Sequence, residues 1–302
     1  MRTLYITGNG FDIYHSLRTR YADFHQFVSD QNSDLENKIE EYFDFQIDAN
    51  YLWKCFENDL CNFNHRAFFD NFNHLDIMDE GFKPSQCFGL EDDIVQESEE
   101  LVQGIKDAFL NWIESIEYPD KAHIATRLLG FEPNSLFLNF NYTDTLEILY
   151  DIPKSQVIYL HNNTTDLSGE LIFGHAEKQE KKPREDDLDE CGNSNRTMFT
   201  DAEDAARATF YEFQKNTDAV MASHQQFFDR LSGIEEVVVL GHSLGRVDWP
   251  YFQRIASSIP SAKWKISYYP FAAKKELEYD ATEMLRALSP KIAMIEIQDL
   301  LS

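Results

Sequence analysis

Cysteine and long apolar runs are scarce in this sequence. The 302 residues include 4 cysteines, none in a C-x-x-C pair, and their scatter matches neither zinc-ligand spacing nor a disulfide framework. No stretch approaches the roughly 18 apolar residues that a membrane-spanning helix needs. The opening MRTLYITGNGFD has too short an apolar run for a signal peptide. We therefore expect a cytoplasmic chain with reduced thiols and no membrane partner.

Positive charge is also in short supply. The chain has 27 Lys and Arg against 53 Asp and Glu, which gives a formal net charge of −26. Such a surface repels phosphate backbones and gains little from counterion release, so we expect no nucleic-acid partner. A small anionic cofactor remains compatible with this charge, because backbone N–H groups can bind phosphate without net positive charge.

Apolar material, by contrast, is plentiful. Hydrophobic residues make up 43% of the chain, and 24 residues are phenylalanine, which is too much core material for a disordered protein. The length suits one large domain, or one domain that carries a sizeable insertion.

The order of elements favours an α/β fold. Apolar runs predict strands at 3–7, 136–140, 157–160, 171–173, 236–240, 264–269 and 292–297. Between the first two strands the pattern becomes helical. Buried strands separated by helices predict a Rossmann-like, mostly parallel sheet. We therefore expect an α/β core formed by residues 1–20 and 131–302, and a helical insertion or cap at 21–130.

Helix signals are clear in two segments. Ser33-Asp34-Leu35-Glu36 has the form of a capping box, and residues 92–117 carry an apolar stripe with acids opposite, which predicts the longest helix. A further helix is expected over about 201–231.

Three polar loops follow the strongest strands. They are Gly8-Asn9-Gly10-Phe11-Asp12, Asn141-Tyr142-Thr143-Asp144 and Gly241-His242-Ser243-Leu244-Gly245. In parallel sheets ligands bind beyond the carboxyl ends of the strands, so these loops are the candidate site. Gly8 and Gly10 suit close approach to a phosphate, but a G-x-G alone lacks the third glycine of the dinucleotide fingerprint and equally suits a structural turn.

The third loop matches the G-x-S-x-G nucleophile elbow of serine hydrolases. That fold requires a histidine after the serine, whereas the last of the nine histidines is His242, so a triad in the usual chain order cannot form. A hydrolase using Ser243 with His161 or His175 stays open as an alternative.

Several polar residues at strand ends have both a functional and a structural interpretation. His161 is placed for acid–base chemistry or for a hydrogen bond to a loop carbonyl, and Asn141 for a ribose hydroxyl or for capping a helix. Asp12 and Asp248 share this ambiguity. The histidines lack metal-ligand spacing, so we expect no metal.

Taken together, these motifs resemble the bacteriophage abortive-infection AbiH family. The resemblance rests on the segments 6–12, 138–147 and 240–252, and runs from the first strand to about Ile255. It implies a role in bacterial defence against phage, with a phage-encoded or host protein as the expected trigger.

The same succession of loops is similar to the sirtuin-like NAD-binding domain. That likeness implies NAD as substrate or ligand, with Asn141 and His161 as the catalytic residues of an NAD glycohydrolase. The residues implied to contact the cofactor are Gly8, Asn9, Gly10, Phe11, Asp12, Thr143, Gly241, Ser243 and Asp248. The zinc module of protein deacylases is missing, which argues against deacylation. A non-catalytic module that senses nucleotides or binds proteins, with or without oligomerisation, is the remaining alternative.

Overall fold

The computed structural model describes residues 2–45, 53–163, 171–177, 190–194, 196–268, 274–288 and 290–301. The chain divides into two compact units. The sheet unit comprises Met1–Asp23, Leu110–Ile172 and Asn216–Ser302. The helical unit comprises Phe24–Phe109 and Phe173–Lys215. No helix in the described ranges is both long and apolar enough to cross a membrane.

The sheet unit is built on six parallel strands in the order β3-β2-β1-β4-β5-β6. Their bounds are β1 Thr3–Thr7, β2 Leu136–Asn139, β3 Val157–Tyr159, β4 Glu236–Leu240, β5 Lys263–Tyr268 and β6 Lys291–Glu296. This is the strand order of the Rossmann fold, with its direction of winding reversed between β1 and β4. The predicted α/β class with a parallel, Rossmann-like sheet is confirmed.

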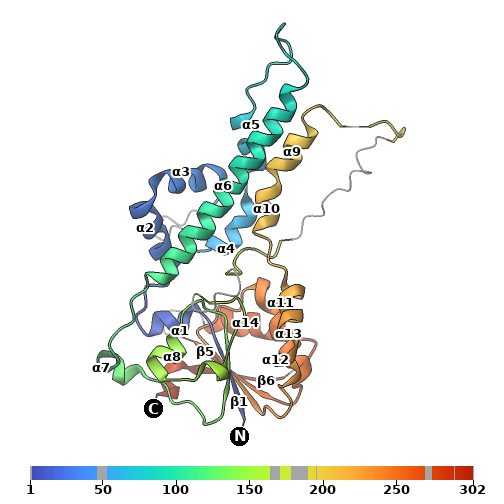
Figure 1. Ribbon diagram of the computed structural model, residues 1–302. Coiled ribbons are helices and arrows are strands. Elements are labelled where there is room, and N and C mark those ends of the chain that lie inside the picture. Colours follow the sequence, from blue (N-terminus) through green and yellow to red (C-terminus); the bar gives the residue numbers. More distant parts are fainter. Residues whose placement is uncertain are drawn as a thin grey trace. The chain divides into compact units, whose positions relative to one another are not determined.

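Helices cover both faces of this sheet (Figure 1), which explains why β1 and β4 are buried at every position. One face, including Leu4 and Ile6, packs against α11 (Thr217–Ser223), α12 (Gln225–Asp229), α13 (Trp249–Ser258) and α14 (Lys274–Met284). The other, including Tyr5, packs against α1 (Asn9–Tyr14), α8 (Thr145–Tyr150) and η6 (Ile297–Leu300). Short helical segments lie at α7 (Lys121–Ile124), η2 (Ala125–Arg127), η3 (Lys154–Gln156) and η5 (Arg246–Asp248).

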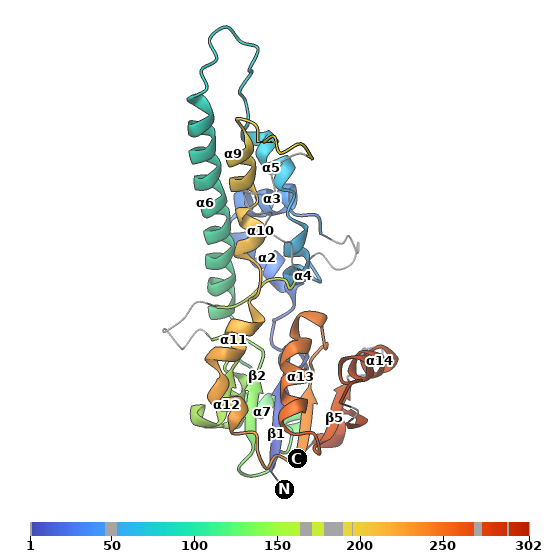
Figure 2. The same ribbon diagram turned by 90° about the vertical axis from the view of Figure 1, so that its right-hand side faces the viewer.

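The helical unit has an aromatic core. The Phe24 ring lies 5.0 Å from that of Phe56 and 5.3 Å from that of Phe109. The elements of this unit include α2 (Tyr21–Gln31), α3 (Ser33–Tyr42), α4 (Phe56–Asp59), η1 (Leu60–Asn62), α5 (His65–Phe72), α6 (Gln86–Glu114), α9 (Thr200–Ala206) and α10 (Ala208–Glu212). Helix α6 runs beside α9 and α10 (Figure 2), and the buried Ser98 and Thr209 hydroxyl oxygens lie 2.7 Å apart.

Three local predictions are wrong. The expected helix over 201–231 is divided into α9 to α12. The expected strand at 171–173 is an irregular segment, because Phe173 packs its ring 4.4 Å from that of Phe109. The expected capping box at 33–36 does not form. Instead Asn32 caps α3 by accepting a hydrogen bond from the Leu35 N–H, so the helix begins at Ser33.

Candidate functional site

The carboxyl ends of β1, β2, β3 and β4 bring the predicted site residues to one edge of the sheet. The Asn141 side-chain amide donates to the Gly8 carbonyl at 3.0 Å. The ring of Phe140 lies 5.6 Å from that of His161 and 4.5 Å from that of His242. Segments more than a hundred residues apart in the chain therefore converge beside the reversal of the winding between β1 and β4, as the loops after these strands predict.

At this edge the two glycine loops touch each other, backbone against backbone. The Gly10 N–H donates to the Gly241 carbonyl at 2.7 Å, and the Gly8 N–H donates to Leu240 at 3.0 Å. Gly241 has φ +62°, and a Cβ there would lie 2.1 Å from the Phe11 nitrogen. The glycines thus permit close contact between loops, and the Gly8, Gly10 and Phe11 N–H groups are already donating within the protein. A phosphate must be held by other groups nearby.

Asp12 and Thr143, both predicted to contact a cofactor, hydrogen-bond to each other in the interior. The Asp12 carboxylate is fully buried and accepts from the hydroxyls of Thr143 at 2.5 Å and Thr145 at 2.7 Å. Burial raises the pKa of Asp12 to about 6, although the hydroxyl hydrogen bonds act in the opposite direction. These contacts tie the β1–α1 turn to the β2–α8 loop.

Asn9 and Asn141 are each held by hydrogen bonds to backbone or side-chain groups. The Asn9 side chain donates to the Thr19 carbonyl at 2.7 Å. The backbone N–H of Asn141 donates to the Asn139 side-chain oxygen at 3.0 Å, and that oxygen also accepts from the Thr7 hydroxyl at 2.7 Å. Asn139, at the end of β2, is a positioning residue that the sequence did not reveal, because its pattern is that of a strand residue.

His161 lies in an aromatic environment. Its side chain is 3% exposed, with the ring of Tyr142 at 6.2 Å and that of Tyr251 at 5.9 Å, in addition to Phe140. Tyr142 also donates its hydroxyl to the Ile172 carbonyl at 3.0 Å. An imidazole beside apolar rings favours its neutral form, which is the form that a general base requires.

His242 and Asp248 form a pair that the sequence analysis missed. The His242 Nδ1 accepts from the Leu244 N–H at 2.9 Å, so the ring proton is on Nε2, which lies 3.4 Å from the Asp248 carboxylate. Asp248, predicted to bind a cofactor, therefore faces a histidine. Leu244, with φ +57°, makes the turn that brings the two side chains together. No sequence signal beyond a histidine and an aspartate six residues apart could have revealed the pair.

Ser243 is the exposed member of this loop. Both nitrogens of the adjacent His242 are occupied, by Leu244 and Asp248. Within the described ranges no histidine ring hydrogen-bonds to the Ser243 hydroxyl. The arrangement therefore offers no activated serine, and the hydrolase alternative gains nothing from the geometry.

His175 belongs to the helical unit, where its Nε2 lies 3.0 Å from the Phe210 carbonyl oxygen. Burial lowers the pKa of His175, which favours a neutral ring bonded to a loop carbonyl. The contacts of this histidine are therefore those of a structural residue.

A pocket of about 340 Å³ lies along the edge strand β3. Its lining consists of Lys154, Val157, Ile158, Tyr159, Asn162, Asn163 and His224. The Asn163 amide and the Tyr159 hydroxyl both donate to the Asp144 carboxylate, at 2.8 and 3.0 Å. The pocket thus borders the loop that carries Asn141, and it does not include Gly10 or Ser243.

Comparison with known proteins gives one match. Residues 4–268 match the sequence model of a family described as bacteriophage abortive infection AbiH. No curated protein and no solved structure matches the chain.

Proposed function

Because this chain belongs to the bacteriophage abortive-infection AbiH family, which implies an anti-phage function, we propose that its sheet unit binds a nucleotide in the course of that defence. NAD is the proposed ligand, by its likeness to sirtuin-like domains. The ligand would lie over the carboxyl edge of the sheet, against the loops that follow β1, β2 and β4.

The single observation that carries the proposal is the strand order. In open α/β sheets, ligands bind where the strand order reverses its direction, outside the carboxyl ends of the strands. Here that point lies between β1 and β4. Asn141, His161 and His242 are gathered beside it.

The groups that can reach a ligand are those at the surface of the loops. Asn9 and Gly10 are half-buried, and Ser243 is exposed. Arg246 is also exposed, with its guanidinium 5.6 Å from the centre of the Trp249 ring. In this proposal the Ser243 hydroxyl and the Arg246 guanidinium bind phosphate oxygens, since the glycine N–H groups donate elsewhere.

The proposed reaction is hydrolysis of the bond between nicotinamide and ribose. A water oxygen attacks the anomeric carbon as the C–N bond breaks, and the bond's electron pair neutralises the pyridinium nitrogen of the departing nicotinamide. His161 accepts the proton of the attacking water, while Asn141 orients that water or the ribose hydroxyls. The products are nicotinamide, ADP-ribose and one proton.

The test measures nicotinamide released when the purified chain is incubated with NAD, with NADP and ATP as competing ligands. We expect His161→Gln to lower the rate at least about 100-fold, since a general base typically contributes 10²–10⁴-fold. Asn141→Ala should also reduce the rate. Ser243→Ala should raise KM, whereas Ser257→Ala, at another exposed serine, should leave both parameters unchanged.

Unchanged turnover in folded His161→Gln and Asn141→Ala proteins would show that these residues are not catalytic. NAD binding by calorimetry without turnover would instead support the second candidate, a nucleotide-sensing module. One observation favours that candidate. The aromatic rings around His161 limit the access of water to its imidazole.

A further inference from the structure

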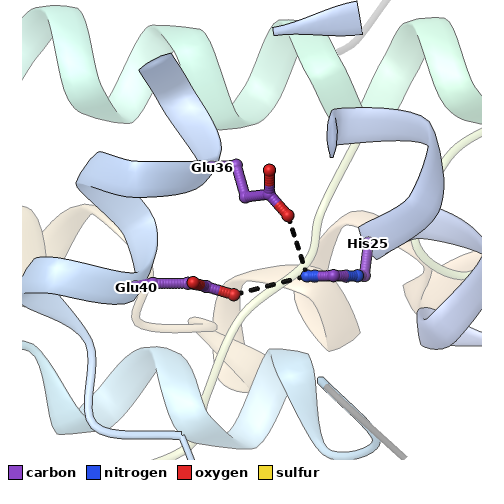
Figure 3. A group of neighbouring side chains, drawn as sticks. All are labelled: His25, Glu36 and Glu40. Atoms are coloured by element: carbon purple, nitrogen blue, oxygen red, sulfur yellow. Dashed lines mark hydrogen bonds and ion pairs between the residues drawn. The ribbon is translucent and has the colours of Figure 1, made fainter. Parts of the chain in front are cut away.

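The helical unit brings together one histidine and two glutamates from adjacent helices. His25 lies on α2, and Glu36 and Glu40 lie on α3. The His25 Nε2 is 3.1 Å from a Glu36 carboxylate oxygen and 3.3 Å from a Glu40 carboxylate oxygen. Figure 3 shows both carboxylates pointing at the same ring nitrogen, and the three donor atoms all lie within 4.8 Å of one another.

The local structure explains this convergence. Residues four apart on a helix lie on the same face, which places Glu36 directly beside Glu40. Asn32, between α2 and α3, caps α3, and this tight corner turns the second helix back towards His25. The Trp53 ring packs edge-on against the imidazole at 4.8 Å and fixes its plane.

Two carboxylates on one helix face repel each other, and a cation between them removes that repulsion. A single Nε2–H cannot donate fully to both carboxylates. Metal–ligand bonds of about 2.0–2.2 Å place neighbouring donor atoms roughly 3.0–3.5 Å apart. The two distances from Nε2 fall within that interval.

We propose that His25, Glu36 and Glu40 bind a divalent first-row transition cation, such as Zn²⁺ or Mn²⁺. One imidazole and two carboxylates form a donor set that suits these ions. The side chains of His25 and Glu36 are 16% and 17% exposed, whereas that of Glu40 is 48% exposed. The site is therefore open on the Glu40 side, where water or a ligand completes the coordination of the cation.

The test is titration of the full, chelator-treated chain with Zn²⁺ by calorimetry, and with Co²⁺ by visible absorption. We expect one equivalent of cation to bind. His25→Gln and Glu40→Gln should each weaken binding at least about tenfold, because each removes a ligand. Glu41→Gln, with the same charge change at the next position of α3, is the matched control and should bind as the unaltered chain does.

A thermal-unfolding experiment keeps the test decisive if a variant is poorly folded. Added Zn²⁺ should raise the Tm of the unaltered chain and of Glu41→Gln, and should leave that of Glu40→Gln unchanged. Glu40 is the most exposed of the three residues, so its replacement perturbs folding least. Absence of saturable binding would establish a histidine–glutamate ion pair only, and equal weakening in Glu41→Gln would establish diffuse attraction by acidic residues. Either result overturns the proposal.

Discussion

The two units position their polar side chains by different means. In the sheet unit, the candidate site follows strand ends whose backbones are locked together, as Gly10 and Gly241 are at 2.7 Å. In the helical unit, the histidine–glutamate cluster arises from the spacing of side chains on helix surfaces, with no special backbone geometry. The difference teaches that the first site tolerates little change of its backbone, whereas the second depends on three side chains.

The largest expected effect is that of a methyl group at Gly241. Gly241→Ala should destabilise the chain by about 4 kcal/mol or more, because the residue has positive φ and its Cβ would meet the Phe11 nitrogen at 2.1 Å. Urea denaturation measures the loss. Gly245→Ala in the same loop is the control. Its Cβ would meet no atom closer than 3.9 Å, so the change should stay within about 0.5 kcal/mol. Equal effects would break the comparison.

An effect of intermediate size is expected from the buried carboxyl of Asp12. Its pKa is raised from 3.8 to about 6, so the folded state takes up the proton first. The corresponding stability is fully present below pH 3.8 and is lost as the pH rises through about 6. A shift of this size corresponds to about 3 kcal/mol.

Asp12→Asn removes this titration. The free energy of unfolding, measured at pH 7 and at pH 4 by urea denaturation, should therefore rise on acidification by about 3 kcal/mol more in the unaltered chain than in the variant. Other carboxyls titrate in both proteins and cancel in the difference. Parallel pH profiles for the two proteins would contradict the role of Asp12.

The smallest effect is expected in the helical unit and has the opposite sign. Gly89 lies in α6, and a Cβ there would meet no atom within 4 Å. Gly89→Ala should stabilise the chain by about 0.5–1 kcal/mol, because alanine loses less conformational entropy in a helix. Gly104→Ala in the same helix should gain less, since its Cβ would lie 3.3 Å from the Leu35 side chain. The Tm values of the two variants decide the matter.

Local patterns predicted the sheet well. The runs TLYIT and EVVVL are strands because every position is apolar or β-branched and is buried. Their parallel arrangement follows from the helices between them, and the parallel arrangement places the following loops at one edge. The convergence of Gly8, Asn141 and His161 was therefore predictable without coordinates.

Contacts between distant segments were not predictable in the same way. The glycine loops suggested phosphate binding, yet their N–H groups donate to the neighbouring loop, a pairing that local sequence does not encode. The His242–Asp248 pair depends on the left-handed conformation of Leu244. The approach of His25 to Glu36 depends on the angle between two helices. Likewise, nothing in the sequence of Phe173–Lys215 indicates that it packs with Phe24–Phe109.

The central place of β1 in the sheet has a consequence for synthesis of the protein on the ribosome. Thr3 pairs with Glu236, and Leu4 with Leu136, so the first strand to leave the ribosome is the one whose partners are made late. At about 5–20 residues per second, β1 waits on the order of ten seconds or more for β4. Phe24–Phe109 emerges during that interval, and the nascent chain must keep a fully apolar strand from pairing elsewhere until translation reaches Leu240.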